Sequence, residues 1–181
     1  IVVVDLCNST NIANKYGDDF ALNLTNILTE AVNPIARRQK VQFMKSTGDG
    51  FLVTFQMIKN AVQFAEDLKN KIGKYNETVE ESKRIDLRFA INCGETRIDA
   101  KGDRLGVATN MTFRVEGVKA ENLIEVEDGY KKEEVPSVNR VFITENVVEE
   151  AEKIKGFKAQ LVGLFELKGI TGLHRIYDLA K

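Results

Sequence analysis

The sequence has no long hydrophobic run and few cysteines and histidines. Within its 181 residues no apolar stretch approaches the roughly 20 residues that a membrane-spanning helix needs, and no signal-peptide pattern precedes the first apolar segment. Cys7 and Cys93 are too few for a disulfide framework or a four-cysteine metal site, which suits a reducing compartment. The single histidine, His174, lies in a predicted terminal strand and is interpreted as structural. We therefore expect a cytoplasmic chain, or the cytoplasmic part of a larger or membrane-anchored protein.

The sequence also has no marked excess of either basic or acidic residues. The chain carries 26 basic and 27 acidic residues, a formal net charge of −1, so no general attraction to nucleic acid or to an anionic membrane is expected. Any phosphate binding must be local. The length and the 43% hydrophobic content suit one globular domain covering 1–181. Because the chain begins at Ile1 without a methionine, we expect it to be a piece of a longer polypeptide that has a regulatory domain elsewhere.

Hydrophobic patterning predicts an α+β fold. Strands are expected at 1–6, 41–46, 51–56 and 85–92, because these runs are apolar and rich in β-branched residues. Apolar residues at helical spacing predict one helix that opens at Asn8 to Thr10 and bends or ends at Pro34, and a second over 57–72. The order βαββαβ indicates a ferredoxin-like or palm-like antiparallel sheet with helices packed on one face and extra C-terminal strands.

Two aspartates are expected to meet at one end of this sheet. A right-handed crossover makes the first two strands parallel, and the third inserts between them, antiparallel to both. This places Asp5, at the end of the first strand, beside Asp49, at the tip of the hairpin "MKSTGDGFLVTF". An Asp-Gly pair is also ordinary hairpin chemistry. Two converging carboxylates nevertheless repel each other unless a cation lies between them, so the pair predicts a magnesium or manganese site.

The segment "LCNST" connects the first strand to the helix that follows it. Backbone N–H groups of Cys7, Asn8, Ser9 and Thr10 at a helix N-terminus can bind phosphate without a basic side chain. An ordinary capped turn fits the same residues, but the two nearby carboxylates favour phosphate binding. The Cys7 thiol would be reactive if the helix dipole lowered its pKa; we interpret it instead as a small buried filler.

Taken in order, the motifs resemble the catalytic domain of the class III nucleotidyl cyclases. "VVDLCNST" is similar to the first metal motif of that family, "MKSTGDGFLVTF" to the second, and "GDRLGVATNMTFR" to the catalytic helix. "LRFAINCGE" is similar to the strand between the second metal motif and that helix. The resemblance extends from Ile1 to about Glu116 and resumes in "VFITENV" and "LFELKGITGLHRIYDL".

The resemblance implies a role for each matched residue. Asp5 and Asp49 would bind two Mg²⁺ or Mn²⁺ ions per site. Asn110 would orient the ribose, and Arg114 would face the charge that develops on the α-phosphate. Lys168 would hold the terminal phosphates. The site would be shared across a homodimer, with the metal ligands from one chain and the other groups from its partner.

Base recognition is implied at two further positions. Lys45 and Asp103 match the residues that contact the purine in adenylate-type members. Adenine offers an amino donor and a ring-nitrogen acceptor, which an Asp and a Lys complement, whereas guanine presents the reverse pattern. The implied activity is therefore an adenylate cyclase that converts ATP into 3′,5′-cyclic AMP and pyrophosphate.

Other activities remain open at this stage. The chain could cyclise a guanine or pyrimidine nucleotide, because the base-reading positions rest on the alignment of a loop. It could also be a nucleotide-binding regulatory module with little turnover, which the polar and bulky "TNMTF" around Asn110 would permit. A diguanylate cyclase is not favoured, because "STGDGFL" lacks the Gly-Gly-acid-Glu-Phe turn. The charged segment 117–140 is expected to form an exposed loop.

Overall fold

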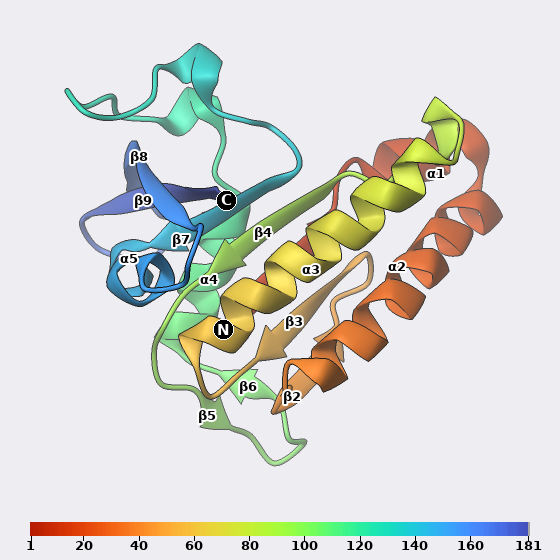
Figure 1. The fold of residues 1–181 in the computed structure, drawn as a ribbon, viewed down its shortest axis with the longest axis horizontal. Coiled ribbons are helices and arrows are strands. Elements are labelled where there is room, and N and C mark those ends of the chain that lie inside the picture. Colours follow the sequence, from red (N-terminus) through yellow and green to blue (C-terminus); the bar gives the residue numbers. More distant parts are fainter. Residues whose placement is uncertain (181) are drawn as a thin grey trace.

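A seven-stranded sheet forms the centre of the computed structural model, which describes residues 1–180. The strand order is β2-β3-β1-β4-β7-β9-β8 (Figure 1). Strands β4 and β7 are parallel, and the other neighbouring strands are antiparallel. The sheet comprises β1 (Val2–Leu6), β2 (Phe43–Ser46), β3 (Gly50–Thr54), β4 (Leu87–Ile91), β7 (Arg140–Thr144), β8 (Lys158–Glu166) and β9 (Leu173–Ala180), and β5 (Arg97–Ile98) and β6 (Arg104–Leu105) form a separate small hairpin.

Helices cover both faces of this sheet. The α-helices are α1 (Ser9–Tyr16), α2 (Asp18–Arg38), α3 (Ile58–Glu77), α4 (Val107–Glu116) and α5 (Glu145–Glu152). Helices α2, α3 and α5 bury their apolar sides in one large core with alternate residues of β1, β3 and β4. Helix α4 lies on the opposite face, where Ala108 and Phe113 pack against Val3 and Leu52 (Figure 1). The predicted fold class is confirmed, and α4 adds a helix to the face that was expected to be bare.

The first predicted helix differs in two details. Gly17, with φ of 93°, separates α1 from α2, because this positive-φ conformation cannot continue a helix. Pro34 does not end α2, which continues to Arg38. The buried side chains of α2 lie on both sides of Pro34, so the packing of that face outweighs the one backbone hydrogen bond that proline removes. No helix among residues 1–180 has the length and apolar character needed to cross a bilayer.

The pairing of β1 with β3 brings the two predicted metal motifs together. Strand β3 lies between β1 and β2 and is antiparallel to both, as the crossover argument predicts. Asp5 lies directly opposite Gly50, and the Leu6 N–H donates to the Asp49 carbonyl oxygen over 3.2 Å. A Cβ atom on Gly50 would lie 2.1 Å from the carbonyl oxygen of Val4, so only glycine permits this close approach of the strands.

The segment 117–140 packs along the edge of β8. It contains the short 3₁₀ turns η2 (Ala120–Asn122) and η3 (Lys132–Glu134), and Ile124 forms a β-bridge with Leu164. Its charged side chains are largely exposed, whereas Leu123 and Val135 are buried in a second, smaller core. The buried side chains of Leu123 and Val135 therefore attach this segment to the rest of the domain.

Candidate active site

Asp5 and Asp49 lie side by side where β1 ends. The Asp5 carboxylate Oδ2 accepts a hydrogen bond from Arg88 Nη2 over 2.7 Å. The hydroxyl of Ser9 donates a hydrogen bond to Asp49 Oδ2. Burial raises the pKa of Asp5; the hydrogen bond from Arg88 opposes this shift, and the negative charge of Asp49 adds to it. The predicted meeting of the two carboxylates therefore occurs, and the ionised form of Asp5 is costly when no cation is bound.

The carboxylates fit a divalent cation that arrives with phosphate. No group of three or more His, Cys, Asp or Glu side chains suited to a metal ion occurs in the described part of the chain. Mg²⁺ is commonly held by one or two carboxylates, with substrate phosphates and waters filling the other positions. Asp5 and Asp49 match that donor set, and the raised pKa of Asp5 indicates a carboxylate that a cation would stabilise in its ionised form.

The segment from Cys7 to Thr10 only partly matches the predicted phosphate loop. Asn8 has a left-handed conformation, with φ of 60°, and precedes the first turn of α1. The N–H groups of Ser9 and Thr10 open that turn and have no acceptor within the helix. Cys7 is a correction, because its N–H donates to the Asp86 carbonyl over 2.8 Å and its buried thiol has a pKa raised to about 11 by burial. Its thiol is therefore protonated at neutral pH, and it has no N–H free for phosphate.

Lys45 and Asp103 form an ion pair within one chain. Lys45 lies in β2 opposite Leu52, and Asp103 lies just before β6. A hydrogen bond from the Asp103 N–H to Asp99 Oδ1, over 2.9 Å, fixes the loop. The two residues predicted to contact the base are thus brought together across 58 positions of sequence.

Asn110 and Arg114 lie on the exposed side of α4. Thr109, Thr112 and Val115 form the buried side, so the polar "TNMTF" segment packs as part of an ordinary amphipathic helix. Thr112 Oγ1 donates to the Ala108 carbonyl over 2.7 Å.

Lys168 lies in the exposed turn after β8. Within residues 1–180, no hydrogen bond or ion pair joins the side chain of Lys168, Asn110 or Arg114 to Asp5 or Asp49. The residues predicted to contact the ribose and phosphates therefore do not pair with Asp5 or Asp49 of the same chain.

The sequence analysis missed Arg88 and Glu116. Arg88 Nε lies 2.7 Å from Glu116 Oε1, and Arg88 Nη2 reaches Asp5. The available signal was a lone charged residue inside the apolar strand "LRFAI". Alternation along β4 directs its side chain away from the large core, toward the face that carries α4.

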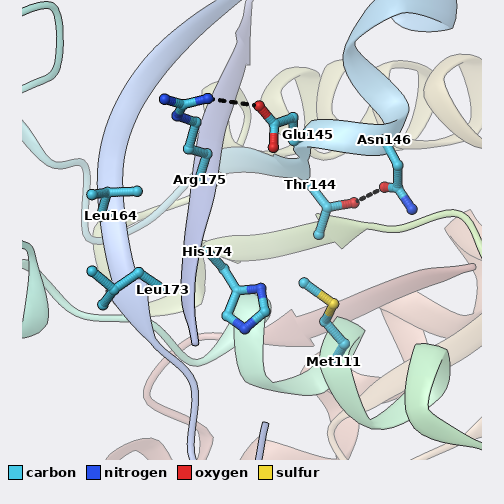
Figure 2. A pocket seen from close by; sticks show the side chains of 8 residues that line it. All are labelled: Met111, Thr144, Glu145, Asn146, Leu164, Leu173, His174 and Arg175. Atoms are coloured by element: carbon cyan, nitrogen blue, oxygen red, sulfur yellow. Dashed lines mark hydrogen bonds and ion pairs between the residues drawn. The ribbon is translucent and has the colours of Figure 1, made fainter. Parts of the chain in front are cut away.

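A cleft beside α4 contains none of the predicted site residues. Figure 2 shows this cavity of about 540 Å³, with Met111 of α4 facing residues from β7, α5, β8 and β9. Arg175 Nη1 lies 3.1 Å from Glu145 Oε1, and Thr144 donates to Asn146. His174 Nε2 lies 3.2 Å from the Thr171 carbonyl oxygen, which agrees with its structural interpretation. Because these polar groups already pair with neighbouring groups, they are poor candidates for binding a ligand in this cavity.

The comparisons with known proteins point to one fold. A crystal structure described as an adenylate/guanylate cyclase/hydrolase from Silicibacter pomeroyi matches 99% of this chain and 95% of that chain, with a TM-score of 0.78 and 20% identity. This chain has the class III nucleotidyl cyclase fold. The cyclase fold also occurs in the adenylyl cyclase CyaB from P. aeruginosa, which matches with a TM-score of 0.74 and 14% identity over 99% of this chain and 92% of that one.

A sequence relative supports the same assignment. "Putative adenylate cyclase 3" from Rhizobium meliloti (strain 1021) is 29% identical over 100 residues, which are 55% of this chain and 17% of that protein. The chain thus matches less than a fifth of that relative's length. No protein-family model matches the sequence. The resemblance to class III cyclases is confirmed by this relative and by the fold.

The pKa of Asp5 predicts how the stability of the metal-free protein depends on pH. The pKa of Asp5 is raised above its usual value of 3.8, so the protonated carboxyl contributes to the free energy of unfolding. This contribution is complete below pH 3.8 and is lost as the pH rises through the raised pKa. Asp5→Asn cannot ionise, so the variant should melt at a higher temperature than the wild type in a chelating buffer at neutral pH. The difference should shrink toward pH 4. Melting curves at both pH values, with exposed Asp128→Asn as control, test this; a variant that is less stable throughout would contradict it.

Proposed function

We propose that this chain is an adenylate cyclase domain that converts ATP into 3′,5′-cyclic AMP and pyrophosphate. The observation that carries the proposal is the meeting of Asp5 and Asp49 at one end of β1. The ion-paired Lys45 and Asp103 support the choice of base, because together they offer the donor and the acceptor that adenine requires. The cyclase fold and the sequence relative support the reaction class.

In the proposed reaction, the ribose 3′-oxygen attacks the α-phosphorus and the bond to pyrophosphate breaks. Two Mg²⁺ or Mn²⁺ ions, held by Asp5 and Asp49, would lower the pKa of the attacking hydroxyl and neutralise the triphosphate. The N–H groups at the start of α1 donate to phosphate oxygens, since they have no acceptor in the helix.

The remaining polar groups orient the nucleotide and balance its charge. Asn110 orients the ribose, and Lys168 binds the terminal phosphates. Arg114 stabilises the negative charge that develops on the α-phosphate, and a fixed guanidinium suits this task because it needs no reorganisation. None of these steps requires a protein general base.

We further propose that each site is shared between two copies of the chain. Asn110, Arg114 and Lys168 are exposed, and none of them forms a hydrogen bond or ion pair with Asp5 or Asp49 of its own chain. A twofold dimer would bring them to the carboxylates of the partner and would create two equivalent sites. Each chain would then supply metal ligands to one site and the base, ribose and phosphate contacts to the other.

The substrate test is direct. The domain is incubated with Mn²⁺ and each nucleoside triphosphate in turn, and the product is identified by its mass. Cyclic AMP is the expected product. A cyclic guanine or pyrimidine nucleotide as product would instead make the chain a cyclase for that base. A guanylate cyclase domain from Catenaria anguillulae has a similar fold, so the fold alone does not decide between the two. Nucleotide binding without any product would favour the regulatory module.

Base selection should depend on the Lys45 and Asp103 pair. Changing Lys45 to Glu and Asp103 to Cys together reverses the hydrogen-bonding pattern, and mispaired polar groups at the base should reduce ATP turnover by about 10²-fold. Steady-state turnover with ATP measures the effect. Lys71→Glu, an exposed change on α3 with the same charge reversal, should leave turnover unchanged. If the double variant uses ATP as the wild type does, these residues do not contact the base.

A further inference from the structure

One guanidinium is shared between the metal carboxylate and the end of the catalytic helix. Arg88 Nη2 lies 2.7 Å from Asp5 Oδ2, and Arg88 Nε lies 2.7 Å from Glu116 Oε1. The three side chains are largely shielded, with exposed fractions of 21% for Asp5, 27% for Arg88 and 12% for Glu116. At such burial these ion pairs are screened less by solvent than surface pairs are.

The backbone fixes each member of this chain of charges. Arg88 lies directly opposite Asp5 in the β1–β4 register. Glu116 is the last residue of α4, and its carbonyl oxygen accepts a hydrogen bond from Arg140 Nη2 over 2.8 Å. Arg140 is itself buried and also donates to the Val118 carbonyl over 2.6 Å. Arg140 therefore fixes the backbone at the end of α4. The Glu116 carboxylate, which belongs to this fixed end, forms the ion pair with Arg88.

Arg88 competes with any cation for Asp5. A guanidinium free to face one carboxylate can bind it through two parallel hydrogen bonds, which is the strongest geometry available to such a pair. Here Nε lies 2.7 Å from Glu116 Oε1, an ion-pair contact without hydrogen-bond geometry, and Asp5 has only the contact with Nη2. Glu116 also adds a negative charge near the two aspartates, which favours a divalent cation.

We propose that Glu116 is a positioning residue for the metal site: it draws Arg88 toward the end of α4 and so leaves Asp5 available to a divalent cation. The inference rests on the proposed role of Asp5 and Asp49 as metal ligands. Glu116 makes no contact with the cation in this role, and its effect passes through Arg88.

The test measures Mn²⁺ binding to the purified domain without nucleotide, by the electron paramagnetic resonance signal of free Mn²⁺. Glu116→Gln keeps the size of the side chain and removes its charge, so it should raise the Kd for Mn²⁺ about three- to ten-fold. Arg88→Gln removes the competitor and should lower the Kd. Exposed Glu121→Gln, which has the same charge change without a contact to Arg88, should bind as the wild type does.

A double variant separates positioning from a direct effect. In the Arg88→Gln background, Glu116→Gln should cause little further change, because its effect requires the guanidinium. An equal loss in that background would overturn the role through Arg88. A folded Glu116→Gln protein with the wild-type Kd would overturn it as well. If Glu116→Gln does not fold, the Arg88→Gln variant tests the proposal by itself. An unchanged or higher Kd for Mn²⁺ in that variant would show that Arg88 does not compete with the cation for Asp5.

The metal site itself is checked in the same experiment with Asp49→Asn. Binding that is present in the wild type and lost in Asp49→Asn supports the metal ligands whatever Glu116 does, so failure of the Glu116 variants alone leaves the proposed function intact. If the wild type binds no Mn²⁺ without nucleotide, the role of Glu116 is wrong, whereas the metal site is then judged by the ATP turnover of Asp49→Asn.

Discussion

Asp49→Asn should lower ATP turnover by at least ~10²-fold, because it removes one of the two charges that would hold the metal ions. The change is nearly isosteric. The backbone contact from the Leu6 N–H and the hydrogen bond from Ser9 both survive it, so the hairpin should stay folded. Turnover is measured with Mn²⁺ and ATP, and circular dichroism checks the fold.

The matched control is Asp128→Asn, an exposed change of the same kind in the segment that follows α4. It should leave turnover unchanged. A folded Asp49→Asn protein with wild-type turnover would rule out the two-metal mechanism.

Mixing two inactive variants should restore activity if the site is shared. Asp49→Ala disables the half-site with the metal ligands, and Arg114→Ala disables the half-site on α4, so each homodimer should be inactive. In a mixed dimer one site carries both lesions and the other carries neither. With random exchange about half of the dimers are mixed, so roughly a quarter of all sites should regain wild-type activity.

A second mixture provides the control for complementation. The Asp49→Ala protein is mixed with the Asp5→Ala protein. Both changes affect the half-site with the metal ligands, so neither site of a mixed dimer is intact and the mixture should stay inactive. Subunit exchange is verified independently with differently labelled chains. If exchange occurs and the mixture of Asp49→Ala with Arg114→Ala remains inactive, the site does not combine residues from two chains.

The strands around the aspartates were predictable because their signals are local. The apolar run before Asp5 and the Asp-Gly turn at Asp49 define two strand ends, and the crossover rule brings those ends together. The face occupied by α4 was not predictable in this way. Helical periodicity indicates that Thr109, Thr112 and Val115 share one buried side, but it does not say which face of the sheet that side covers.

The contacts that join distant segments escaped the sequence analysis for a similar reason. Glu116 and Arg88 are 28 positions apart, and nothing in either local pattern specifies that a helix end meets that strand. Cys7 was misjudged as a phosphate contact because the partner of its N–H, Asp86, comes from another part of the chain. The break at Gly17 depends on a backbone conformation that glycine permits but does not require.

The ion pair between Lys45 and Asp103 has a consequence for substrate affinity. In the free chain these side chains pair with each other, so a base that contacts them as proposed would compete with that ion pair. Adenine replaces both lost contacts, whereas a base that offers only one matching group leaves a charge unpaired. If Lys45 and Asp103 contact the base as proposed, their ion pair would lower the affinity for every nucleotide and would lower it more for the wrong one. A raised KM for ATP is then the expected companion of base discrimination.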